Sequence, residues 1–304
     1  MKIASIDIGT NTVRCLIAEV HDSVLTPEVI YRDIIRLGEG LRARGELDPA
    51  AVGRLTAVLT SYRGHITESG CRKVRAVGTS ALRDADRGGE TGRALYEVLG
   101  HSVDVISGEE EARLTSLGVQ AGIASMIDGL ILDIGGGSTE LIRISSGSNI
   151  WWSSLPAGVV HLTEELFLDD PPLNTQVKAL RNRFRELLDL ERDDGGGQMA
   201  GTAGTPTTLA AVQLGIDDYD PTLVNGHVLS LDTIKDLTEQ FIGMTSAQRL
   251  ALRGMEKGRE DLIVAGSLMV LEVMDRWNYN EMIVSDWGLL EGIALDLAER
   301  DRAN

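Results

Sequence analysis

The chain opens with a short alternation of apolar and polar residues, which indicates two strands joined by a tight loop. Lys2–Asp7 alternates, the Gly-Thr-Asn-Thr sequence at 9–12 turns the chain, and Val13–Val20 is mostly apolar. Glu28–Leu37 predicts a third strand, and a glycine-rich turn follows it. The opening segment therefore predicts three consecutive strands of a β-sheet.

Helical spacing begins at Pro49, a residue that is favoured in the first turn of a helix. One face of this predicted helix carries Val52, Leu55, Leu59, Tyr62 and Ile66. Strands are predicted at 74–77 and 102–106, with a helix at 92–99 between them. Ser107 can cap a further helix, and the three carboxylates of its first turn, Glu109, Glu110 and Glu111, suit the helix dipole.

The opening pattern occurs a second time. Leu130–Asp133, a glycine-rich loop and Glu140–Ile144 repeat it, and Asp7 aligns with Asp133 at a separation of 133 − 7 = 126 residues. The second half continues with predicted strands at 150–155 and 281–285 and predicted helices at 175–191, 230–241 and 259–274. We expect two related α/β domains with mixed sheets, residues 1–124 and 125–304, with the boundary near 120–128.

Composition narrows the class of protein. The chain has 304 residues, of which 43% are hydrophobic and 25% charged, the balance of an ordinary globular protein of about two domains. Its two cysteines, Cys15 and Cys71, cannot form a disulfide framework and suggest a reducing compartment. No signal peptide or membrane segment is expected, so a cytoplasmic location is predicted. The net charge of −17 disfavours nucleic acid and anionic membranes as partners.

The two Asp-Ile-Gly loops carry the strongest chemical signal. A loop of small residues between strands can direct several backbone N–H groups at a phosphate. The aspartate at each strand end, Asp7 or Asp133, can hold Mg²⁺ directly or through water, because Mg²⁺ prefers oxygen ligands. Either loop alone could equally be a simple hairpin turn. Their repetition in register favours phosphate binding.

The motifs of the chain together resemble those of a known family. VISGEEEARL, GTSALR, LDIGGGSTELI, GTAGTPTTLAA and SDWGLLEG, in this order, are similar to the exopolyphosphatase/guanosine pentaphosphate phosphohydrolase (Ppx/GppA) family, from about Lys2 to Leu297. This family belongs to the superfamily of acetate and sugar kinases, heat-shock-70 proteins and actin. The resemblance implies an α/β fold of two ribonuclease-H-like domains, with mixed sheets and a cleft between the domains. It also makes a homodimer a reasonable expectation.

The resemblance implies roles for individual residues. The glutamate directly before Ala-Arg is the family's catalytic base, which falls on Glu111; without that match, three glutamates here would be dipole complements. Glu140 would join Asp7 and Asp133 in holding Mg²⁺ or Mn²⁺. The phosphate-binding set comprises Gly9, Thr10, Asn11, Thr12, Arg14, Thr79, Arg83, Gly135, Gly136, Gly137, Ser138, Thr139, Gly204 and Thr205. Arg259 could contact a long substrate, but an exposed helix start explains it equally well.

The leading hypothesis is an Mg²⁺-dependent exopolyphosphatase that releases the terminal phosphate of inorganic polyphosphate, with Glu111 activating water. Guanosine pentaphosphate is the alternative substrate, because both reactions cleave the same kind of bond. A phosphotransferase of the same superfamily and a nonenzymatic sensor of nucleotide or polyphosphate are the remaining alternatives. A substrate panel with Mg²⁺ present and then chelated separates these hypotheses.

Overall fold

In the computed structural model, which describes residues 1–22, 24–85, 90–126, 128–191 and 195–303, the chain forms two compact α/β units. The first contains Met1–Gly118 and Gly288–Asn304, and the second contains Val119–Trp287. The expected division at 124/125 differs from these units in two ways. The chain leaves the first unit inside a helix, at residue 118, and its last helix returns to that unit.

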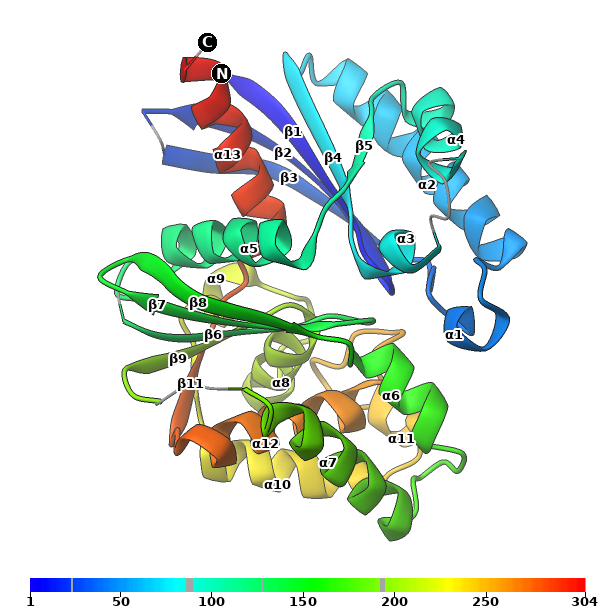
Figure 1. The fold of residues 1–304 in the computed structure, drawn as a ribbon, viewed down its shortest axis with the longest axis vertical. Coiled ribbons are helices and arrows are strands. Elements are labelled where there is room, and N and C mark those ends of the chain that lie inside the picture. Colours follow the sequence, from blue (N-terminus) through cyan, green and yellow to red (C-terminus); the bar gives the residue numbers. More distant parts are fainter. Residues whose placement is uncertain (23, 86–89, 127, 192–194, 304) are drawn as a thin grey trace. The chain divides into compact units, whose positions relative to one another are not determined.

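The first unit is built on a five-stranded mixed sheet (Figure 1). The strand order is β3 (Val24–Ile34), β2 (Thr12–His21), β1 (Lys2–Ile8), β4 (Lys73–Gly78) and β5 (Val103–Val105). β2 runs antiparallel to β1 and β3 antiparallel to β2, whereas β4 and β5 continue parallel to β1. The carboxyl ends of β1, β4 and β5 consequently meet at one edge of the sheet.

The helices of the first unit are α1 (Leu41–Arg44), α2 (Pro49–Glu68), α3 (Ser80–Ala85), α4 (Glu90–Leu99), α5 (Gly108–Gly122) and α13 (Leu289–Ala303). α13 packs on one face of the sheet, and α2 and α4 lie on the other (Figure 1). The predicted helix at 49 is confirmed. Asp48 caps it by accepting from the Ala50 N–H, and Leu55, Leu59, Tyr62 and Ile66 are buried on its inner face as expected. Burial of such an apolar face contributes roughly 1.5–3 kcal/mol for each large side chain.

Two glycines let α5 and α13 approach closely. A Cβ on Gly118 would lie 1.9 Å from the carbonyl oxygen of Gly288, and one on Gly292 would lie 1.8 Å from that of Leu114. The Ser5 hydroxyl donates to the Leu290 carbonyl at 2.8 Å, which ties α13 to β1. This packing explains why the C-terminal helix belongs to the first unit.

The second unit repeats the same strand order and adds an edge strand. It runs β8 (Ser148–Leu155), β7 (Thr139–Ser145), β6 (Gly129–Ile134), β9 (Gln198–Thr202), β11 (Glu281–Val284) and then β10 (Val228–Ser230), which pairs antiparallel. β7 is antiparallel to β6, whereas β9 and β11 are parallel to it. The shared order and directions confirm the predicted pair of ribonuclease-H-like folds with mixed sheets.

The helices of the second unit are α6 (Val159–Leu166), α7 (Asn174–Leu188), α8 (Gly204–Leu214), α9 (Pro221–Val224), α10 (Leu231–Ile242), α11 (Ser246–Leu250) and α12 (Ile263–Trp277). α12 is buried along almost its whole length as part of the hydrophobic core of this unit, and it packs against α7, α8 and α10 (Figure 1). Within the described part of the chain, no helix combines the length and apolar character that crossing a bilayer requires.

Candidate functional site

The first Asp-Ile-Gly loop is a tight connection between β1 and β2. The Gly9 N–H donates to the Thr12 carbonyl at 3.0 Å, and a Cβ on Gly9 would lie 2.9 Å from that same oxygen. A second segment secures the loop from outside, since the Gly38 N–H donates to the Thr10 carbonyl and the Ile35 N–H to the Asn11 carbonyl. The loop is therefore held by the fold before any ligand binds.

Asp7 and Asn11 place buried polar atoms beside this loop. The Asp7 Oδ2 accepts from Arg14 Nη2 at 2.7 Å and from Arg14 Nε at 3.2 Å, because the two residues are directly opposite in the β1–β2 pair. The Asp7 Oδ1 and both amide atoms of Asn11 are buried without a hydrogen-bond partner among the described residues. Buried polar atoms normally have partners, so these are suited to receive a ligand, an ion or water.

Three further predicted residues meet at the same edge of the first sheet. Thr79 follows β4 directly, and its N–H donates to the Ile8 carbonyl at the end of β1. Arg83 lies one turn later, on α3, and its Nη1 donates to Glu111 Oε2 at 2.9 Å. Glu111 is only 6% exposed although it is charged. The first unit thus brings together Asp7, the loop at 9–12, Arg14, Thr79, Arg83 and Glu111.

The second Asp-Ile-Gly loop has the same geometry. The Gly135 N–H donates to the Ser138 carbonyl at 3.0 Å, which matches the bond from Gly9 to Thr12. The start of α6 packs onto this loop, because the Val159 and Val160 N–H groups donate to the carbonyls of Gly135 and Gly136. The Thr139 hydroxyl donates to the Ala157 carbonyl at 2.6 Å and fastens the same contact.

Asp133 and Glu140 lie directly opposite each other at the base of the second loop, on β6 and β7. Both are buried, with 8% and 1% of their surfaces exposed. Ser154 donates to Glu140 Oε1 at 2.7 Å from the neighbouring strand. Two carboxylates on one face of a sheet offer the oxygen ligands that a divalent cation such as Mg²⁺ prefers.

This chemistry fits Mg²⁺ or Mn²⁺ rather than zinc. Asp133 and Glu140 offer carboxylate oxygens as ligands. The first unit, taken by itself, has the Asp7 Oδ1, which lacks a hydrogen-bond partner among the described residues. Within the described ranges, no group of three or more histidine, cysteine, aspartate or glutamate side chains forms a candidate metal cluster. Any cation here would need additional oxygens from water or from substrate phosphate.

The third loop connects β9 to α8. Ala203 adopts φ 67°, which is strained for a residue with a side chain, and Gly204 begins the helix. The Arg259 guanidinium lies against Gly204, because a Cβ there would be 2.2 Å from Arg259 Nη1. Thr205 is buried beside Gly266 of α12.

Arg259 does not lie at an exposed helix start, which is one of the two interpretations of the sequence. The alternative of an exposed helix start is wrong, since α12 begins only at Ile263 and the Arg259 side chain is 14% exposed. The sequence leaves the role of Arg259 open between a substrate contact and an exposed helix start. Only the folded chain shows that its guanidinium lies against Gly204, whose missing side chain makes room for it.

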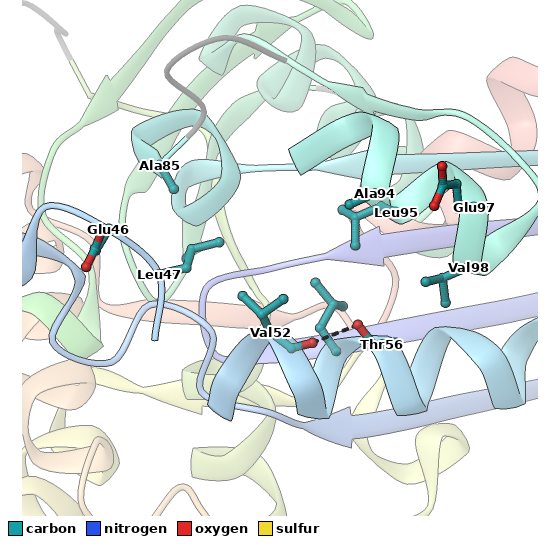
Figure 2. Close-up of a pocket in the computed structure, with 10 residues that line it drawn as sticks. Glu46, Leu47, Val52, Thr56, Ala85, Ala94, Leu95, Glu97 and Val98 are labelled. Atoms are coloured by element: carbon teal, nitrogen blue, oxygen red, sulfur yellow. Dashed lines mark hydrogen bonds between the residues drawn. The ribbon is translucent and has the colours of Figure 1, made fainter. Parts of the chain in front are cut away.

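A separate cavity of about 520 Å³ lies between α2 and α4 in the first unit (Figure 2). Its walls are mainly apolar, and they are formed by Glu46, Leu47, Val52, Leu55, Thr56, Ala85, Ala94, Leu95, Glu97 and Val98. None of these described residues is basic, and none belongs to the predicted phosphate-binding set. The cavity is therefore not the phosphate site, although Ala85 of its wall closely follows Arg83 on α3.

Comparisons with known proteins agree with this arrangement. The model of the Ppx/GppA phosphatase family matches residues 16–301. Exopolyphosphatase 2 of Mycobacterium tuberculosis is 33% identical, over 98% of this chain and 98% of that protein. The guanosine-5'-triphosphate,3'-diphosphate pyrophosphatase of Vibrio cholerae is 28% identical, over 97% of this chain but 59% of that protein. The crystal structure of the Aquifex aeolicus member of the Ppx/GppA family superimposes with a TM-score of 0.86 at 32% identity, covering 99% of this chain and 98% of that one.

Proposed function

Because the chain belongs to the Ppx/GppA phosphatase family, we propose that it is a hydrolase that releases the terminal phosphate of inorganic polyphosphate. The observation that carries this proposal is the buried Glu111 carboxylate, held by Arg83 at the edge of the sheet where the first phosphate loop lies. The similarity of the whole chain to an exopolyphosphatase supports the choice of substrate.

The glycine-rich loops supply the phosphate contacts in this proposal. Gly9, Thr10, Asn11 and Thr12 serve in the first unit, and Gly135, Gly136, Gly137, Ser138 and Thr139 serve in the second. Backbone N–H groups in such loops bind phosphate oxygens without a side chain in the way, although the Gly9 and Gly135 N–H groups themselves close the two turns. Arg14, Thr79, Gly204 and Thr205 complete the set, and Arg83 adds a cation.

Glu111 acts as the general base. Its carboxylate accepts a proton from a water molecule as the water oxygen attacks the terminal phosphorus, and the bond from that phosphorus to the bridging oxygen breaks. The products are orthophosphate and a polyphosphate chain that is one unit shorter. Burial keeps bulk water away from the carboxylate, while Arg83 stabilises its ionised form.

In the second unit Asp133 and Glu140 are the residues that would hold Mg²⁺ or Mn²⁺, and in the first unit the corresponding residue is Asp7. A divalent cation supplies charge neutralisation for the phosphate oxygens when it is bound. Arg14 pairs with Asp7 in the first unit, whereas Asp133 faces Glu140 in the second unit.

Guanosine pentaphosphate is the second candidate substrate. The similarity to the Vibrio cholerae pyrophosphatase favours it, as does Arg259 beside Gly204, where a planar guanidinium could meet a further phosphate or a base. The chain spans 59% of that relative, so the extra part of the longer protein has no counterpart in this comparison.

A substrate panel tests the proposal. Phosphate release is measured from long-chain polyphosphate, guanosine pentaphosphate and ATP at equal enzyme, with Mg²⁺ present and after chelation. Rapid metal-dependent release from polyphosphate supports the proposal, whereas turnover of the guanosine compound alone reverses the order of the two substrates. Formation of ATP from polyphosphate and ADP would instead assign a phosphotransferase.

A further inference from the structure

The sequence assigns Arg83 to phosphate binding, yet two groups of the protein itself hold its guanidinium. Nη1 donates to the Ile106 carbonyl at 2.9 Å and to Glu111 Oε2 at 2.9 Å. The Arg83 side chain is 28% exposed and that of Glu111 is 8% exposed, so this ion pair is partly withdrawn from solvent. Pairs with this degree of burial are screened less than surface pairs.

The two acceptors, the Ile106 carbonyl and the Glu111 carboxylate, lie at the two ends of the short connection from β5 to α5. Ile106 directly follows β5, and its N–H donates to the Gly78 carbonyl at 3.0 Å. Glu111 lies in the first turn of α5, and its N–H donates to the Ser107 carbonyl at 2.9 Å. A single nitrogen of Arg83 therefore ties the end of β5 to the carboxylate that α5 presents.

We infer that Arg83 is a positioning residue for Glu111: it fixes the direction of the Glu111 carboxylate and keeps that carboxylate ionised. This inference rests on the proposed role of Glu111 as the base. A guanidinium has five N–H groups, and the two bonds described here both use Nη1. The remaining N–H groups can meet a substrate phosphate, so one cation would align the base and the substrate together.

The other arginines near α5 are directed at different carboxylates. Arg75 of β4 and Arg113 of α5 bind Glu110 and Asp296, and Arg300 of α13 binds the same two acids. An Asp104 carboxylate oxygen also lies 3.7 Å from Arg75 Nε. Arg113 consequently provides a matched control, because it contacts the same helix turn through Glu110 rather than through Glu111.

The test uses the full-length chain and the variants Arg83→Lys, Arg83→Gln and Arg113→Gln. The values of kcat and KM for polyphosphate are measured from pH 4.5 to 8. In parallel, the ¹³C signal of the Glu111 carboxyl, assigned with Glu111→Gln, is titrated in the absence of substrate. For Arg83→Gln we expect kcat to fall ~10²-fold or more, because the base is misplaced. The acidic limb of its rate profile and the NMR midpoint should both move to higher pH, since the neighbouring positive charge is lost.

Rescue separates positioning from folding. Arg83→Lys should recover part of kcat and return the NMR midpoint toward that of the parent protein, whereas Arg113→Gln should leave both unchanged. A rise in KM alone, with kcat and the midpoint unchanged in Arg83→Gln, would overturn the inference and leave Arg83 as a simple phosphate contact. If the midpoint moves in Arg83→Gln but the parent protein releases no phosphate from any substrate, the proposed function fails while the Arg83–Glu111 coupling stands.

Discussion

Asp133 faces Glu140 across the β6–β7 pair, whereas the equivalent aspartate of the first unit, Asp7, faces Arg14. The two loops share their backbone geometry, including the bond from the first glycine to the residue three positions later. The base of one loop therefore holds a carboxylate–guanidinium pair, and the base of the other holds two carboxylates. We expect a divalent cation at the second pair, because carboxylate oxygens are the ligands that it prefers.

Replacing Asp133 with Asn or Glu140 with Gln should weaken Mn²⁺ binding at least ~10-fold, because each change removes a charged oxygen ligand. Ser154→Ala should weaken binding less, by roughly 10-fold at most, through loss of its hydrogen bond to Glu140. Binding is measured on the substrate-free protein by electron paramagnetic resonance of added Mn²⁺. Asp128→Asn, an exposed site near the other end of β7, is the control. Equal affinities in all four variants would remove this pair from the cation site.

Glu111→Gln should lower phosphate release from polyphosphate by ~10²-fold or more, because a neutral amide cannot take the proton of the attacking water. The isosteric change should leave the unfolding transition in urea nearly unchanged. Glu109→Gln is the matched control, since Glu109 lies in the same helix turn but is exposed. Turnover in Glu111→Gln that equals the control would exclude Glu111 as the base.

Much of the fold follows from the sequence because local patterns and tertiary packing agree. The strand–loop–strand units at both Asp-Ile-Gly loops form as predicted, as does the helix capped by Asp48. β3 begins at Val24 rather than at Glu28, so Pro27 lies inside a strand. Proline is tolerated there because β3 is an edge strand and Pro27 pairs with Ala18 at an irregularity in the register.

The parts that the sequence did not predict depend on contacts between distant residues. The return of α13 to the first unit requires the close approach of Gly292 to Leu114, which no local pattern reveals. Likewise, only the folded chain shows that Arg83 binds Glu111 and that Arg14 pairs with Asp7. Motif order could propose these residues as a site, but it could not give the partner of each side chain.

Gly158→Ala tests how closely α6 supports the second loop. A Cβ at Gly158 would lie 2.3 Å from the carbonyl carbon of Gly136 and 2.4 Å from the Gly137 nitrogen, so backbone must move. We expect about 1–3 kcal/mol of destabilisation and a drop in phosphate release of ~10-fold or more. Tryptophan fluorescence in urea reports this unit, because all four tryptophans lie between residues 119 and 287.

The control for this substitution is Gly64→Ala in the C-terminal half of α2. A Cβ at Gly64 has no atom within 4 Å, so alanine should stabilise the helix by about 0.5–1 kcal/mol. Since the tryptophans do not report the first unit, its unfolding is followed by amide hydrogen exchange of α2 peptides. Parent-like activity and stability in Gly158→Ala would show that the loop does not depend on this contact.

The ion pairs of Glu110 should make the stability of the first unit sensitive to acid. The Arg113 hydrogen bonds, followed by that of Arg75, lower the pKa of Glu110 from 4.5 to about 2, against the opposing effect of burial. Because the pKa of Glu110 is lower in the folded chain than in the unfolded chain, its ionised carboxylate stabilises the fold at pH values above the unfolded pKa. That contribution is lost as the pH falls from about 4.5 toward 2. Glu110→Gln should therefore cost about 1–2 kcal/mol near pH 6 and progressively less below pH 4.5. The unfolding free energies of parent and variant are compared at pH 3 and pH 6 by hydrogen exchange of α5 peptides. The control is Glu28→Gln, because the Glu28 side chain is more exposed than that of Glu110. A Glu110→Gln penalty that is the same at pH 3 and pH 6 would contradict this origin of the acid sensitivity.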